Sequence, residues 1–405
     1  LTISLTHHPH ARKELLLGKT LRVVSRSGLN PTERALIEQL PALKSEDGAF
    51  RSPLFLGGRT GALALALWLT RGREVQGALT LHTLDAPVQG TLERNLAENH
   101  APLAAPGASF GFACSTAPDL AGVPPGNIAF WQMTKGDGTA EQHLALLERL
   151  ASDAFLPGLR LLIAADESFN ETFLKRFRKA CGNAITLRRE GAVYILSGRV
   201  LHPVPVADLP DHRAAFTVSL RGHAPLELVT LPGCFCHRRA DMGGLALAET
   251  VADQVAFDRN DRVMDMGCGC GMVGLLLAAA FPEKDLRVDY QDSNAAARES
   301  TQLNLHRYPH NARFFFPLKE WVTRRDLFLA NPPYFGDWRI AQAFIESAAR
   351  LLKPGGILAF VSKREAKPLE LITAAGFEPL GAFSRRGYTI LLAARRENAL
   401  LRPNT

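Results

Sequence analysis

The residues best suited to chemistry lie in the tetrapeptide Asn331-Pro332-Pro333-Tyr334, which follows an apolar run at residues 326–330. An exocyclic or amide nitrogen is a poor nucleophile because its lone pair is delocalised. Acceptors on its two hydrogens favour the tetrahedral form and stabilise the positive charge that grows during attack. The Asn331 side chain and the Pro332 carbonyl can accept in this way, prolines make the loop rigid, and the Tyr334 ring offers a stacking face. The pattern predicts methylation of such a nitrogen; an ordinary turn after a strand is the alternative.

A second motif upstream predicts the site of the methyl donor. Residues 262–266 form a short apolar run that contains Asp265, and glycines then alternate at Gly267, Gly269 and Gly271. Residues 272–280 have strong helix propensity. A strand, a glycine turn and a helix make the first unit of a doubly wound sheet, and the glycines let the backbone approach a ligand closely. We therefore expect a ligand site at this turn.

The identity of that ligand is open at this point. A second strand is expected at residues 286–292, and its last residue, Asp292, is placed to accept from two ribose hydroxyls. The glycines of the dinucleotide fingerprint are also present, at Gly269, Gly271 and Gly274, so a nicotinamide cofactor fits this segment. Asp265 and the later Asn-Pro-Pro-Tyr loop favour S-adenosylmethionine instead.

Residues from about 205 to 396 resemble a class I S-adenosylmethionine-dependent methyltransferase of the Asn-Pro-Pro-aromatic type. With the segment Asp241-Met-Gly243-Gly244 upstream, the layout is similar to the bacterial rRNA guanine-N2 methyltransferases of the small-subunit type. The resemblance implies that Asp241 and Gly243 lie by the methionine end of the cofactor. The implied cofactor residues are Asp241, Gly243, Asp265, Gly267, Gly269, Gly271, Asp292 and Asn331, and the implied catalytic residues are Asn331, Pro332, Pro333 and Tyr334.

The first half of the chain repeats this layout without the chemistry. Residues 55–67 align with the glycine turn and helix, because Gly57 and Gly267 are 267 − 57 = 210 residues apart. Arg59 replaces the middle glycine, and no Asn-Pro-Pro follows the corresponding strand, which ends near Lys135. We expect an α/β fold of two tandem doubly wound, Rossmann-like domains. Residues 1–204 would be a degenerate copy with an RNA-recognition or structural role, residues 205–405 the catalytic domain, and residues 201–210 the linker.

The composition favours a polyanionic partner. The 405-residue chain has a net charge of +7 and a pI near 9.2, which suits ribosomal RNA or a ribosomal subunit. Residues 175–179 carry four cations, and Phe173 and Phe177 are spaced to lie on one buried helix face. Arg385 and Arg386 fall in an expected hairpin, where they could reach a substrate phosphate.

Other features limit the possibilities. No apolar run is long enough to span a membrane, and we expect a cytoplasmic monomer with free thiols. Two cysteine pairs, Cys234 with Cys236 and Cys268 with Cys270, could suggest a zinc site. Since the second pair lies within the glycine turn, we interpret these residues as small buried thiols and expect no metal.

Three positions depart from the family pattern. Tyr334 and Phe335 stand where phenylalanine and histidine are usual, Leu318 stands where a polar residue would contact the adenine, and Gly244 stands where serine is common. Adenine recognition would then rest on Glu320 or on backbone groups. The alternatives are a protein glutamine-N5 or adenine-N6 methyltransferase, and a non-catalytic RNA-binding or ribosome assembly factor. The favoured substrate is guanine N2 in a flipped or single-stranded base.

Overall fold

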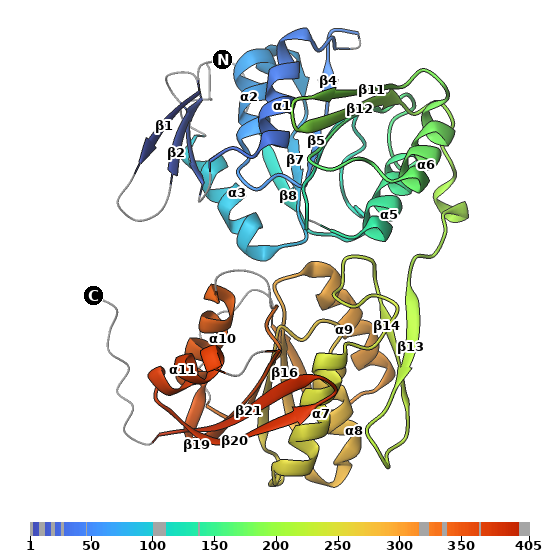
Figure 1. The fold of residues 1–405 in the computed structure, drawn as a ribbon. Helices are drawn as coiled ribbons and strands as arrows, with labels where there is room; N and C mark the ends of the chain where they lie inside the picture. The colour runs from blue at the N-terminus through green and yellow to red at the C-terminus, as the bar shows by residue number, and fades with distance from the viewer. Residues whose placement is uncertain are drawn as a thin grey trace. The chain divides into compact units, whose positions relative to one another are not determined.

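The computed structural model describes residues 3–7, 13–17, 21–25, 28–45, 47–99, 111–136, 138–315, 324–333, 338–363 and 366–396. Two compact units make up the chain, Leu1–His212 and Arg213–Thr405 (Figure 1). Their boundary lies a few residues after the position predicted between residues 204 and 205. The predicted linker contains a short 3-10 turn, Val206–Asp208.

The second unit is built on a seven-stranded sheet with the order β17-β16-β15-β18-β19-β21-β20. Its strands are β15 Arg262–Met266, β16 Arg287–Gln291, β17 Ala312–Phe315, β18 Arg325–Ala330, β19 Leu352–Ser362, β20 Phe377–Arg385 and β21 Tyr388–Arg395. The first five run parallel and the last two antiparallel to their neighbours. The parallel strands therefore end at one edge of the sheet, which is where open α/β sheets bind ligands.

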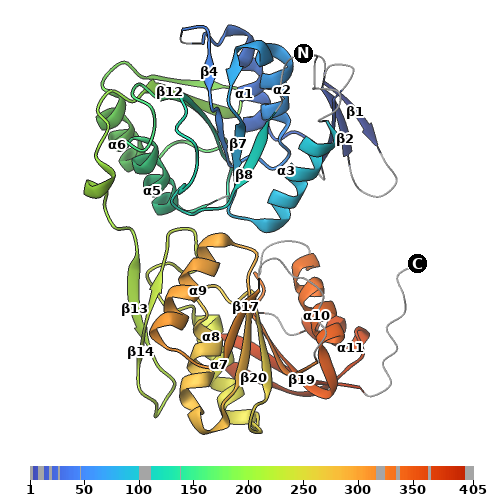
Figure 2. The same cartoon turned by 180° about the vertical axis from the view of Figure 1, so that it is seen from behind.

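Helices cover both faces of this sheet, as Figures 1 and 2 show. The helices α7 Met242–Gln254, α8 Met272–Ala280 and α9 Ala295–Arg307 pack with Val263 and Leu327 in one apolar core. The helices α10 Arg339–Leu351 and α11 Ala366–Ala374 pack with Met264 and Phe328 in another. Neighbouring residues of β15 and β18 thus enter opposite cores, which explains why these strands read as continuous apolar runs.

The first unit has the same topology. Its sheet has the order β8-β7-β5-β9-β10-β12-β11 when read in the same direction. The strands are β5 Leu54–Leu56, β7 Leu79–His82, β8 Phe112–Ser115, β9 Ile128–Met133, β10 Arg160–Ala165, β11 Thr186–Glu190 and β12 Val193–Arg199. The helices are α1 Pro31–Gln39, α2 Ala62–Arg71, α3 Ala86–Glu98, α5 Ala140–Leu150 and α6 Glu171–Cys181. The predicted tandem of two doubly wound α/β domains is confirmed.

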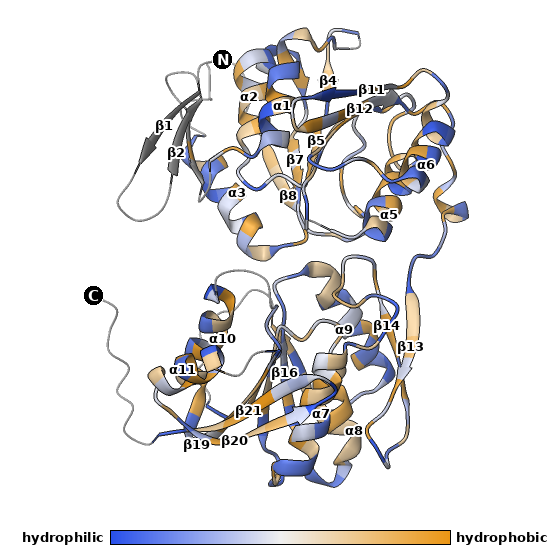
Figure 3. Cartoon of the chain, in the orientation of Figure 1, coloured by the Kyte–Doolittle hydropathy of each residue, from blue (hydrophilic) through white to orange (hydrophobic). Residues whose placement is uncertain are grey.

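Smaller elements complete the two units. A three-stranded sheet contains β1 Ile3–His7, β2 Lys13–Leu17 and β3 Leu21–Ser25; β4 Phe50–Arg51 pairs with β6 Val75–Gln76, and β13 Ala214–Val218 with β14 Leu226–Thr230. Short 3-10 turns span Leu40–Ala42, Gly72–Glu74 and Pro282–Lys284. In Figure 3 the edge strand β11 has the hydrophilic colour, whereas the neighbouring strand β12 is largely hydrophobic.

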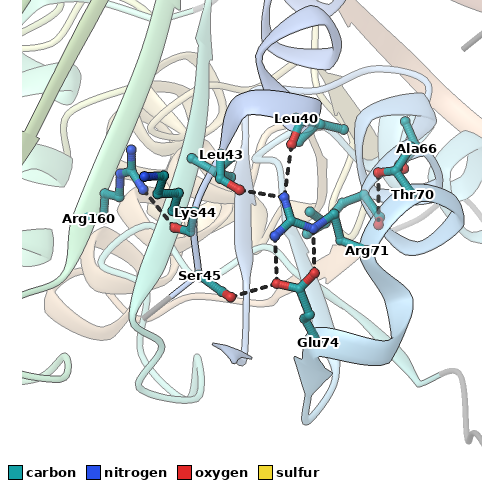
Figure 4. Close-up of polar contacts among 10 residues, drawn as sticks. Leu40, Leu43, Lys44, Ser45, Ala66, Thr70, Arg71, Glu74 and Arg160 are labelled. Carbon is teal, nitrogen blue, oxygen red and sulfur yellow. Dashed lines mark hydrogen bonds and ion pairs between the residues drawn. The ribbon is translucent and has the colours of Figure 1, made fainter. Parts of the chain in front are cut away.

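One arginine joins separate segments of the first unit. Arg71, at the end of α2, pairs with Glu74 at 2.5 Å and donates to the carbonyls of Leu40 and Leu43 (Figure 4). Ser45 donates to the same Glu74 carboxylate at 2.6 Å. The C-terminal end of α2 is thereby fixed to the segment that follows α1.

Candidate cofactor and catalytic site

The glycine turn of the second unit has the geometry that its sequence predicts. Gly267, Gly269 and Gly271 have φ values of 68°, 58° and 81°, in the left-handed region that favours glycine. A Cβ on Gly269 would meet nothing within 4 Å, so the turn is open on that side. A Cβ on Gly274 would lie 2.7 Å from the Tyr290 ring, which shows how closely α8 packs on β16. The turn therefore leaves room for a ligand beside Gly269.

Asp265, on β15, is bonded to the helix that follows this turn. The side chain is only 4% exposed, and its Oδ2 accepts a hydrogen bond from the amide of Gly274 at 3.0 Å. Burial raises the pKa of Asp265 to about 7, against the opposing effect of the Gly274 bond, and the charge of Asp292 raises it further. Asp265 thus occupies the Gly274 amide near the N-terminus of α8, where a bound phosphate would otherwise accept hydrogen bonds.

Asp292 holds the turn from the end of β16. Its Oδ2 accepts from the amide of Gly269 at 2.9 Å, and its Oδ1 accepts from the amide of Asn294 at 2.8 Å. The carboxylate is therefore fixed beside the open part of the turn. Contact between Asp292 and a ribose stays a prediction. That contact requires a carboxylate at the end of this strand, and Asp292 lies there.

Asn331 follows β18 directly, and Asp241 orients it. The Asn331 Nδ2 donates to the Asp241 Oδ2 at 2.5 Å. Asp241 is also the N-cap of α7, since it accepts from the amides of Gly243 at 3.3 Å and Gly244 at 2.8 Å. This arrangement fixes which end of the Asn331 amide is the donor and turns Oδ1 away from the carboxylate. Pro332 is buried beside it.

Part of the predicted site lies outside the described residues. Tyr334 and Phe335 belong to that part, and so do Leu318 and Glu320, the positions named for adenine recognition. Pro333 is partly buried at the end of the described segment. The stacking and adenine contacts therefore stay predictions.

Three carboxylates converge on the turn. Gly244, at the start of α7, is so close to α8 that a Cβ there would lie 3.0 Å from Met272 and 3.3 Å from Val273. Asp241 therefore lies near the same end of α8 that Asp265 caps, with Asp292 on the turn itself. The charges of Asp241 and Asp292 favour a ligand with net positive charge and disfavour a pyrophosphate, whereas Asp265, with its pKa raised to about 7, carries only part of a charge at neutral pH.

The cysteines near the turn are packing residues. All six cysteines of the chain are free thiols. Cys234, Cys268 and Cys270 are buried, and burial raises the pKa of Cys270 to about 12. In the described part of the chain, no three His, Cys, Asp or Glu side chains are grouped as metal ligands. Nor does any helix there have the length and apolarity to cross a membrane.

The first unit contains a counterpart of the Asp241–Asn331 pair. Asn30 is the N-cap of α1, and its Nδ2 lies 3.5 Å from the side-chain oxygen of Gln132. Gln132 directly follows Trp131, the residue of β9 that pairs with Leu56, just as Asn331 follows Ala330, which pairs with Met266. A short hydrogen bond between a carboxylate and an amide in the second unit thus corresponds to a longer contact between two neutral amides in the first.

A carboxylate from α1 caps the helix that follows the glycine turn of the first unit. Glu33 on α1 is fully buried, and its carboxylate accepts from the Thr60 hydroxyl at 2.7 Å and from the Leu63 amide at 3.3 Å. Burial raises its pKa, against hydrogen bonds that lower it, the strongest from Thr60. Both Glu33 and Asp265 therefore cap the helix that follows a glycine turn. Asp265 does so from the strand beneath, whereas Glu33 does so from α1, on the side where the second unit has Gly244.

Sequence reasoning missed Glu33 and Gln132. The spacing Asn30-x-x-Glu33 is a known helix-start signal, and it would have marked Glu33 as part of the helix N-terminus. Gln132 would follow from aligning the ends of the catalytic strands. Arg59, the sequence sign of degeneration, is exposed on the turn, and Lys135 pairs with Glu167 at 2.9 Å.

Of the two predictions made for basic segments, the buried face of α6 is confirmed, whereas the two arginines of the hairpin are paired with acidic residues. Phe173 and Phe177 are 1% and 0% exposed, so the burial predicted for one face of α6 is confirmed. Arg385 and Arg386 do lie at the turn of the β20–β21 hairpin, but both are committed to ion pairs. Arg385 contacts Asp253 at 2.6 Å, and Arg386 contacts Glu249 at 2.7 Å. Acids of α7 thus occupy the two cations that we expected to reach phosphate.

Comparisons with known proteins agree with this geometry. Residues 225–391 match the family model described as the methyltransferase small domain. The "Ribosomal RNA small subunit methyltransferase C" of Hahella chejuensis is 32% identical over 34% of this chain and 41% of its own length. The corresponding protein of Shewanella loihica is 27% identical over 54% of this chain and 64% of its own length. The chain thus spans less than two thirds of these relatives.

Two further matches extend the comparison. The "Ribosomal RNA large subunit methyltransferase G" of Shewanella halifaxensis is 28% identical over 51% of this chain and 50% of its own length. A solved 16S rRNA N2 methyltransferase of T. thermophilus, in complex with AdoMet and guanosine, matches 98% of both chains with a TM-score of 0.71 and 22% identity. At that identity the likeness establishes the fold, and it covers both units.

Proposed function

We propose that this chain belongs with the ribosomal RNA methyltransferases to which it is similar, and that it methylates guanine N2 in ribosomal RNA with S-adenosylmethionine as donor. The observation that carries the proposal is the hydrogen bond from the Asn331 amide to Asp241, at the end of β18 and near the glycine turn. Acceptor groups held in this way suit an exocyclic amine.

The residues of the turn fit this cofactor. Space is open beside Gly269, and the carboxylates of Asp241 and Asp292 favour a cation. S-adenosylmethionine carries a sulfonium and an ammonium group against one carboxylate, whereas a nicotinamide dinucleotide carries a pyrophosphate. Because Asp265 already accepts from Gly274 at the helix N-terminus, the dinucleotide is the poorer fit. When bound, the cofactor supplies an electrophilic methyl group.

The chain's own residues act by positioning. Asp241 fixes the Asn331 amide, so its oxygen can accept from the N2 hydrogens and stabilise the charge that develops on the nitrogen. The Pro332 carbonyl offers a second acceptor in a rigid loop, and the Tyr334 ring would stack on the base. The base must leave its pair to reach this site, so an unpaired or flipped guanine is the expected substrate.

The first unit keeps the fold but holds no cofactor in this proposal. Glu33 caps the helix after its turn from α1, and the amide pair of Asn30 and Gln132 lacks the charge that orients Asn331. Its role would be to support the second unit and to contact ribosomal RNA. Such a substrate implies a cytoplasmic location; a monomeric state is expected.

The test is direct. The protein is incubated with labelled S-adenosylmethionine and with naked rRNA or isolated ribosomal subunits, and the RNA is then digested to nucleosides. N2-methylguanosine is the expected product. Methylated adenosine, or label only in protein glutamine, would replace the guanine assignment by one of its rivals. Absence of any transfer despite cofactor binding would favour a non-catalytic RNA-binding factor.

A further inference from the structure

Two side chains outside the site described so far lie at the same edge of the second sheet. Lys363 directly follows β19, and Tyr388 begins β21. Phe360 of β19 pairs with Ala330, the residue before Asn331, and Ser362 pairs with Thr389. Lys363 and Tyr388 therefore emerge beside the strand end that carries Asn331.

A direct contact links these two residues. The Lys363 Nζ lies 5.5 Å from the centroid of the Tyr388 ring, within the range of a cation–π interaction. Within the described residues, Lys363 forms no ion pair with a carboxylate. Burial and then the charges of Asp241 and Cys236 raise the pKa of Tyr388, so the ring lies within electrostatic reach of the carboxylate that orients Asn331.

The hairpin that carries Tyr388 is anchored. Arg385 and Arg386 at its turn bind Asp253 and Glu249 on α7, the helix that begins directly after Asp241. The N-cap of α7 therefore holds Asn331, and acidic residues within α7 hold the hairpin. The Lys363 ammonium thus lies over a ring of fixed position, which limits the freedom of its long side chain.

We propose that Lys363 binds a phosphate of the target nucleotide and that Tyr388 is the positioning residue that holds its ammonium over the ring. The proposal deepens the proposed function and rests on RNA as the substrate. An ammonium group is a compact charge well suited to phosphate. Arg385 and Arg386 are committed to α7, whereas Lys363 remains available next to the catalytic strand end.

The test compares Lys363→Gln with Lys367→Gln. Lys367 is an exposed cation on α11 that pairs with Glu370 at 2.8 Å, so its substitution removes the same charge away from the strand end. We expect Lys363→Gln to weaken affinity for a guanine-containing RNA oligonucleotide by about tenfold at low salt and to reduce the salt slope of binding by about one. The kcat and the S-adenosylmethionine affinity should stay unchanged. Equal effects of the two substitutions on RNA affinity would overturn the proposal.

The role of Tyr388 has its own readout. Tyr388→Phe keeps the ring and should behave as the unmodified protein, whereas Tyr388→Leu should raise the KM for RNA about threefold without changing kcat. Loss of activity in Tyr388→Phe, with KM unchanged, would mean that the hydroxyl acts in the reaction and that the positioning role is wrong.

Ligand binding separates this inference from the proposed function. Guanosine 5′-monophosphate should bind more tightly than guanosine to the unmodified protein in the presence of S-adenosylhomocysteine, and Lys363→Gln should abolish the difference. Equal binding of the two ligands to the unmodified protein would overturn the phosphate site even if guanine N2 is methylated. If guanosine 5′-monophosphate binds more tightly than guanosine but no methyl group is transferred, the phosphate site is supported and the proposed reaction is wrong.

Discussion

Replacing Asp241 by Ala tests whether this carboxylate orients the catalytic amide. The substitution removes the acceptor that lies 2.5 Å from the Asn331 Nδ2 and also the N-cap of α7. Loss of a charge-assisted hydrogen bond costs about 1.5–3 kcal/mol, which corresponds to roughly a ten- to hundredfold lower rate if the bond orients Asn331 in the transition state. Loss of the cap costs about 0.5–2 kcal/mol of folding stability.

A matched control separates the two effects. Asp85 is the N-cap of α3 in the first unit, where it accepts from the amide of Val88 at 3.3 Å. Asp85→Ala removes the same charge and the same kind of cap, so both substitutions should lower the unfolding free energy, Asp241→Ala by the larger amount because it also loses the bond to Asn331. Only Asp241→Ala should lower kcat. Asp241→Asn keeps a good capping residue and should lower kcat only a few-fold, because a neutral acceptor remains.

The assay measures kcat at saturating RNA and cofactor, cofactor affinity by calorimetry, and stability by denaturant unfolding. An unchanged kcat in Asp241→Ala would refute the orientation argument. A loss confined to S-adenosylmethionine affinity would also refute it, and would support the role at the methionine end of the cofactor that the sequence resemblance implies.

Three further predictions concern other side chains. Asn331→Ala should lower the methyl-transfer rate by about 10²-fold or more and leave calorimetric cofactor affinity nearly intact, since it removes a transition-state acceptor; a tenfold loss of affinity with unchanged kcat would contradict this. The pKa of Asp265 is raised by burial to about 7, so its protonated form favours the folded state, and this contribution is lost as pH rises from about 4 to about 7. In urea unfolding, the free energy of unfolding of the unmodified protein should therefore fall by up to about 4 kcal/mol relative to that of Asp265→Asn as pH rises through this range. A difference between the two proteins that does not change with pH would disprove the raised pKa. Glu33→Ala should destabilise the chain by about 1–3 kcal/mol, since Thr60 loses its buried partner. Calorimetry should still find one S-adenosylmethionine bound per chain, with unchanged affinity. A weaker cofactor affinity would show that the two turns are coupled.

The sequence by itself determined the local geometry of the glycine turn. Alternating glycines between an apolar strand and a helix-forming segment require a backbone with positive φ, and Gly267, Gly269 and Gly271 have it. Asp292 could be placed because a strand boundary fixes which residue comes last. The repeat at an offset of 210 residues likewise predicted that both halves share one topology, since equal patterns of strand, turn and helix fold alike.

Only the tertiary structure decided which distant side chains meet. Asp241 and Asn331 are 90 positions apart, and they meet because a helix N-terminus packs beside the end of a central strand. Glu33 reaches Thr60 in the first unit because α1 packs on α2, and no local pattern reveals whether such a carboxylate caps a neighbouring helix or points to solvent. Arg385 and Arg386 appeared available in the sequence, but α7 supplies their partners. Local spacing fixes backbone conformation, whereas the packing of elements far apart in the chain fixes the neighbours of each side chain and therefore its chemistry.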